Sequence, residues 1–112
     1  MTFDPDGSEQ DEENELEELF VAFNEHVHEF AQEHDLNDAV VSMLALRLSL
    51  ATRMFDYMMS TENPSGSGLK LELDRFRRDV EDSVRAMRKG ADEYVAQAKQ
   101  AIAEAEAEEK PD

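Results

Sequence analysis

Apolar side chains recur at helical spacing through the last third of this chain. From Leu73 to Ile102 they follow one another at steps of three and four residues, in a pattern that repeats every eleven residues. Such a repeat corresponds to about 3.67 residues per turn, which keeps an apolar stripe nearly straight along a helix. We therefore predict a long helix over residues 69–108. The stripe consists of Leu73, Phe76, Val80, Val84, Met87, Ala91, Val95, Ala98 and Ile102.

Gly90 lies inside this stripe and is the residue that argues against a continuous helix. A glycine in the middle of a helix costs about 1 kcal/mol relative to alanine. The stripe stays in phase on both sides of Gly90, which favours a single helix. The alternative is a break at Lys89-Gly90, which would give four helices in the chain.

Two earlier segments also have the periodicity of helices. One apolar stripe predicts an amphipathic helix over 14–33, and its members are Leu16, Phe20, Phe23, Val27 and Phe30. A second helix is predicted over 38–60, with Asp35 or Asn37 as its N-cap. The apolar side chains of this second helix cover about 260° of its circumference. Its surface must therefore contact neighbours on at least two sides.

The fold class that follows is all-α. A turn of a few residues between the first two helices predicts an antiparallel helical hairpin, along which the third helix folds back. Residues 1–13 form an acidic tail that we expect to be disordered, because it has few apolar side chains to bury. Residues 62–68 are expected to be a flexible loop. The prediction is one helical domain over 14–110, a three-helix bundle with a fourth helix if the chain breaks at Gly90.

The acidic residues are concentrated at one end of the chain. There are 28 acidic and 11 basic residues, for a net charge of −17, and residues 1–46 contain 14 acidic residues and no lysine or arginine. This balance argues against direct binding to nucleic acid or to anionic membranes. Three explanations remain open: adaptation to a high-salt cytoplasm, a binding face for a basic protein partner, or an acidic tail that merely precedes a helix.

The basic residues of segment 69–99 are interleaved with acidic ones. The i,i+4 spacings of Asp74 to Arg78 and of Glu81 to Arg85 predict ion pairs on a solvent-exposed face. This face could also lie against the acidic first helix. Arg47 differs, because it falls in the middle of the apolar arc of the second helix. We expect it to pair with an acidic residue of another helix, or to act as a buried charge that fixes the register of a bundle or dimer.

No constellation of residues indicates catalysis or cofactor binding. Glu25 and His28 have the Glu-x-x-His spacing of di-iron helical bundles, but all histidines lie between His26 and His34, so one chain cannot supply the second half of such a site. The chain has no cysteine, which excludes disulfides and thiolate metal sites. We therefore predict no catalytic, cofactor-binding or metal-ligating residues. The polar first 15 residues do not resemble a secretion signal, so we expect a cytoplasmic protein.

The apolar surplus of the second and third helices predicts self-association. A long third helix would overhang a three-helix bundle and leave its second half uncovered, and a homodimer would cover this surface. The predicted interface consists of Met43, Leu46, Leu50, Met54, Tyr57, Ala91, Val95, Ala98 and Ile102.

Two functions from different classes fit these features. The first is a non-enzymatic, oligomer-forming helical protein that acts as an adaptor, regulator or scaffold. The alternative is an acidic mimic of nucleic acid, of the kind that phages and mobile elements encode, which would occupy the basic groove of a DNA- or RNA-binding protein.

Overall fold

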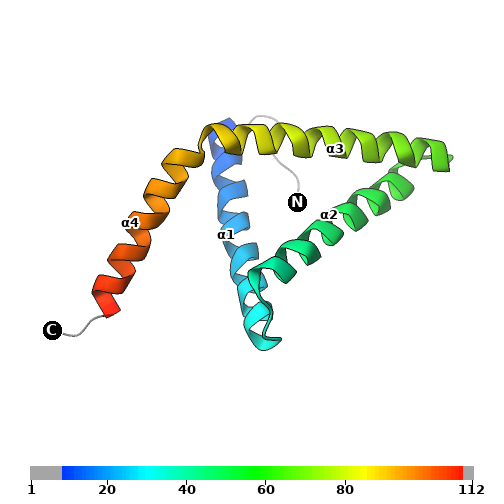
Figure 1. Ribbon diagram of the computed structural model, residues 1–112. Helices are drawn as coiled ribbons and strands as arrows, with labels where there is room; N and C mark the ends of the chain where they lie inside the picture. The colour runs from blue at the N-terminus through cyan, green and yellow to red at the C-terminus, as the bar shows by residue number, and fades with distance from the viewer. Residues whose placement is uncertain (1–8, 110–112) are drawn as a thin grey trace. The chain divides into compact units, whose positions relative to one another are not determined.

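The computed structural model describes residues 9–109, all of whose regular structure is helical (Figure 1). Four helices follow one another: α1 (Glu9–Glu33), α2 (Asp38–Ser60), α3 (Gly66–Lys89) and α4 (Ala91–Glu109). This confirms the all-α class. Within the described range, no helix is both long enough and apolar enough to cross a membrane. The backbone divides into two compact units, one up to Ser49 and one from Leu50 onward.

The first unit contains α1, the turn that follows it and the first half of α2. Asp35 adopts a left-handed conformation with φ of 53°. The backbone N–H of Leu36 donates to the carbonyl of Ala31 at 2.9 Å, and that of Asp35 to Gln32 at 3.4 Å. These two bonds form the Schellman motif that ends many helices. Asn37 then caps α2, since its Oδ1 accepts from the backbone N–H of Val40 at 2.9 Å. Of the two N-caps considered, the structure selects Asn37.

The start of α1 differs from the predicted tail. The helix begins at Glu9, so residues 9–13 are helical rather than disordered. Acidic side chains in the first turns of a helix interact favourably with its dipole, which offsets their mutual repulsion. The rest of the predicted tail, residues 1–8, lies outside the described residues.

The second unit contains the turn between α2 and α3, which is shorter than the predicted loop. Ser65 is the N-cap of α3, and its Oγ accepts from the backbone N–H of Gly68 at 3.0 Å. The Tyr57 hydroxyl accepts from the N–H of Ser65 at 3.0 Å and donates to its carbonyl at 3.3 Å. Residues 66–68 therefore belong to the helix, and the prediction of a flexible loop through residue 68 is wrong there. A capping serine outweighs the two glycines that follow it.

The predicted continuous helix over 69–108 is also wrong. It is interrupted at Gly90, whose φ of −96° and ψ of 8° end α3, and α4 begins at Ala91. Charge explains why a glycine suffices to break an in-phase stripe. Arg88 and Lys89 lie in the last turn of α3, and Asp92 and Glu93 in the first turn of α4. Each set of charges stabilises a helix end, so the sequence favours two termini at this point.

Candidate functional site

Arg53 of α2 holds α2 and α3 together in the second unit. Its Nη1 lies 3.4 Å from Oε1 of Glu72, and its Nη2 lies 3.1 Å from Oδ2 of Asp79. The guanidinium also lies over the ring of Phe76, at 5.1 Å from the ring centroid. Glu72, Phe76 and Asp79 occur at the i, i+4 and i+7 spacing of one face of α3. One side chain therefore joins two ion pairs and a cation–π contact, which fixes the position of α3 relative to the second half of α2.

No partner for Arg53 was predicted from the sequence. The i, i+4, i+7 spacing of Glu72, Phe76 and Asp79 was the available signal. The predicted i,i+4 pairs were also different from those that form. Arg85 pairs with Asp82 at 3.4 Å. Arg78 donates to the backbone carbonyl of Asp74 rather than to its carboxylate.

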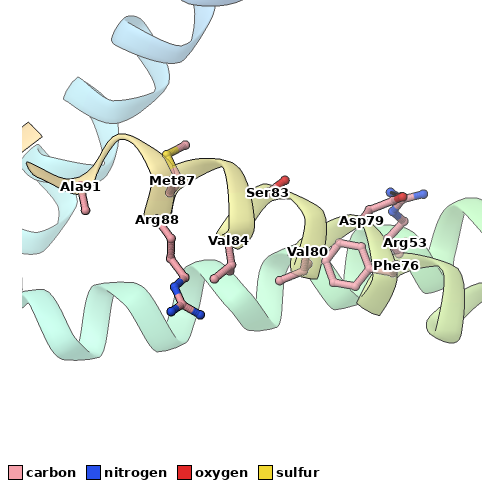
Figure 2. A pocket seen from close by; sticks show the side chains of 9 residues that line it. All are labelled: Arg53, Phe76, Asp79, Val80, Ser83, Val84, Met87, Arg88 and Ala91. Atoms are coloured by element: carbon pink, nitrogen blue, oxygen red, sulfur yellow. Dashed lines mark hydrogen bonds and ion pairs between the residues drawn. The ribbon is translucent and has the colours of Figure 1, made fainter. Parts of the chain in front are cut away.

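An open apolar groove of about 560 Å³ continues from this contact along α3. Figure 2 shows Phe76, Val80, Val84 and Arg88 projecting from the same side of the helix. These four residues follow one another at i+4 steps, so three apolar side chains form a row that ends in a cation. The groove reaches Ala91 at the start of α4. It is an apolar surface with one basic end rather than an enclosed pocket.

The basic end of this surface continues around α3. A second open hollow of about 590 Å³ adjoins Val80 and Val84 and is also lined by Arg85, Arg88 and Lys89. Among the described residues, Arg88 and Lys89 take part in no ion pair. Their charges are therefore available to a partner.

The first unit contains its own apolar hollow, of about 280 Å³, between α1 and the first half of α2. Phe23, Val27 and Phe30 line it from α1, and Leu44 and Leu48 line it from α2. Three of these side chains remain about half exposed: Phe23 at 54%, Phe30 at 52% and Leu48 at 54%. The helix α1 and the first half of α2 therefore do not close a core between them.

The residues of the predicted interface lie on α2 and α4. Those whose side chains are exposed are Met43, Leu46, Met54, Ala91, Val95 and Ile102. Leu50, Tyr57 and Ala98 are partly buried. Tyr57 holds the turn before α3 through its hydroxyl, a contact that its apolar position in the sequence did not indicate.

A break at Gly90 could have allowed α4 to cover the apolar surface of α2 within one chain. The described chain does not use it in this way: Phe55 and Met58 of α2 are 67% and 52% exposed, and Val95 and Ile102 of α4 are 49% and 59% exposed. Both surfaces therefore remain open.

Arg47 is exposed in the single chain and forms no ion pair with any described residue. The expected pairing with an acidic residue of another helix is not formed in this part of the chain. A role as a buried charge that sets the register of an oligomer stays a prediction.

The three histidines and Ser60 lie on exposed surfaces. His26 lies 3.9 Å from Glu29 on α1, and the ring of His34 lies 4.4 Å from that of Phe30. The hydroxyl of Ser60 donates to the backbone carbonyl of Asp56 at 2.6 Å. In the part of the chain that the structure describes, no group of three or more histidine, aspartate or glutamate side chains could hold a metal ion.

No protein-family model, no curated protein and no solved structure matches this chain. The features of this chain that bear on function are therefore its exposed apolar and charged surfaces.

Proposed function

We propose that this chain is a non-enzymatic helical protein that assembles with copies of itself and acts as an adaptor, regulator or scaffold. One observation carries the proposal. Among the residues whose side chains are described, Ala31, at 8% exposed, is the single buried apolar residue, whereas twenty-two large apolar side chains are exposed. Each of the two units therefore needs a further surface to complete its core.

The energies involved favour association. Burying a large apolar side chain contributes about 1.5–3 kcal/mol, and a folded domain is stable by only about 5–15 kcal/mol in all. Five or six such side chains left in water therefore forgo an amount as large as the stability of a typical domain. A second copy supplies apolar surface of the same kind, and most oligomers of soluble proteins are symmetric dimers.

Sedimentation equilibrium at micromolar concentration tests the proposal. We expect a mass of twice the 12.8 kDa of the chain, or a larger even multiple. The variant Leu50→Glu, which places a charge in the predicted interface, should lower that mass. Glu106→Gln changes an exposed residue of α4 outside the predicted interface and should leave the mass unchanged. A mass of 12.8 kDa for the unaltered chain would contradict the proposal.

An acidic mimic of nucleic acid is the second candidate, and one observation favours it. Helix α1 carries ten acidic residues and no lysine or arginine. Glu15, Glu17, Glu18 and Glu25 are exposed and form no ion pair among the described residues. A rigid row of carboxylates of this kind suits the basic groove of a nucleic-acid-binding protein. Capture of such a protein from the native host, reversed by duplex DNA and by high salt, would support this function. Capture of nothing but the chain itself would count against it.

A further inference from the structure

We propose that α1 of a second copy docks antiparallel along the apolar groove of α3, with its acidic N-terminal half beside the basic C-terminal end of α3. The inference rests on the proposed function, because it requires self-association, and it adds a contact between α1 and α3 to the predicted interface on α2 and α4. Three features of the molecule support it: an open groove, a stripe that matches the groove in length, and complementary charge.

The receiving surface is the row of side chains on α3. Val80 is 39% exposed, Val84 is 52% exposed and Met87 is 75% exposed, so this surface lacks a partner within the second unit. Arg53 of α2 binds Glu72 and Asp79 beside the start of the row. The row from Val80 to Met87 is therefore open to a helix from elsewhere.

The apolar stripe of α1 matches this groove in kind and in length. Leu16, Phe20 and Phe23 are 53%, 60% and 54% exposed, and the stripe extends to Phe30. Leu16 to Phe30 spans about 21 Å at 1.5 Å per residue. The row of α3 from Phe76 to Ala91 spans about 22 Å by the same measure. Two amphipathic helices of this kind pack by fitting the side-chain ridges of one into the grooves of the other.

Charge distinguishes α3 from the other helices. Of its last seven residues, 83–89, three are basic and none is acidic, whereas its first seven, 66–72, contain one lysine and one glutamate. That glutamate, Glu72, is already bound by Arg53 and Arg75. Lys70 and Arg78 also form no ion pair with described residues, but the two adjacent basic residues of α3 that lack one, Arg88 and Lys89, lie at its C-terminal end.

The charge of α1 has the opposite sign and is also concentrated at one end. Seven of its ten acidic residues lie within 9–18. Glu13 and Glu17 lie along one edge of the apolar stripe on a wheel of 100° per residue. Placing this end beside Arg88 and Lys89 makes the two helices antiparallel. Antiparallel packing also brings opposite ends of the two helix dipoles together.

The docked α1 belongs to a second copy because the proposed function requires self-association. A two-fold axis then forms the same contact twice, and each copy both gives and receives a helix.

Charge reversal tests this contact by sedimentation equilibrium of the full chain. The double variant Glu13→Lys with Glu17→Lys should weaken the dimer by roughly tenfold or more, since attraction becomes repulsion at both symmetric contacts. Adding Arg88→Glu and Lys89→Glu should restore the dissociation constant to within about threefold of the original. The control, Glu106→Lys with Glu108→Lys on α4, changes the net charge of −17 by the same amount without touching the proposed contact.

The sign of the effect makes the test decisive. Both lysine variants reduce the net negative charge, so general repulsion between copies predicts that both strengthen the dimer. The proposal predicts that the α1 variant weakens the dimer and that the α4 control does not. A dimer that is unaffected or strengthened by the α1 variant, or one that the α3 reversal fails to rescue, would overturn this contact and leave self-association standing. A monomeric unaltered chain would overturn both.

Discussion

Replacing Arg53 with alanine should destabilise the second unit by about 1.5–2 kcal/mol. The ion pair with Glu72, whose side chain is 20% exposed, is partly shielded from water and contributes up to about 1 kcal/mol. The ion pair with Asp79, whose side chain is 63% exposed, contributes about 0.3 kcal/mol. The cation over Phe76 adds about 0.5–1 kcal/mol. At about 4–8 °C per kcal/mol, the midpoint of thermal unfolding should fall by on the order of 10 °C.

Circular dichroism during thermal unfolding measures this change, and Arg78→Ala provides the matched control. Arg78 is an exposed arginine of α3 that forms no ion pair with described residues, so its loss should shift the free energy of unfolding by less than about 0.5 kcal/mol. Arg53→Lys keeps the charge but loses the planar fork that reaches two carboxylates, and should lie between the two. If Arg53→Ala is no more destabilising than Arg78→Ala, the contact does not hold α2 to α3.

Four substitutions that remove or introduce a glycine test the turns. Gly68→Ala should lower the free energy of unfolding by about 1–3 kcal/mol, because a β-carbon there would collide with the Tyr57 phenol. A β-carbon at Gly66 would meet open space, so Gly66→Ala should be neutral or stabilising. Equal urea midpoints for the two variants would argue against the Tyr57 contact. Asp35→Gly should raise the urea midpoint, by about 0.5–1 kcal/mol in free energy, because glycine adopts a φ of 53° without strain; a lower midpoint would contradict the observed turn. Gly90→Ala should increase helicity measured by circular dichroism, since the added carbon meets only a backbone oxygen at 3.9 Å; reduced helicity would show that the break at Gly90 is required for folding.

Local periodicity was sufficient to predict the helices but not all of their ends. The 3–4 spacing of Leu16 to Phe30 and of Leu73 to Val84 is a property of the segment itself, and the structure has helices at both places. The interruption at Gly90 depends on the charged residues on both sides of the glycine. The spacing of apolar residues contains no information about these charges. The early start of α3 depends on the Ser65 cap.

The contacts between helices were harder to predict, because they join residues that are distant in sequence. The partners of Arg53, Glu72 and Asp79, are 19 and 26 residues away along the chain, and they become evident only when α3 lies beside α2. Tyr57 was predicted as part of an apolar interface, but its hydroxyl accepts from the backbone N–H of Ser65, eight residues away. Arg47 was predicted to be paired or buried because it lies in an apolar arc of α2. In the single chain, however, Arg47 is exposed.

The central claim is that this chain completes its core with a second copy, and the dependence of unfolding on protein concentration tests it most directly. If folding and association are coupled, each tenfold increase in concentration adds about 1.4 kcal/mol to the apparent stability. With a urea m-value of about 1–3 kcal/mol/M, the urea midpoint should rise by about 0.5–1.4 M for each tenfold step. A midpoint that is the same at all concentrations would contradict the claim, because it would show that one chain folds to its full stability alone.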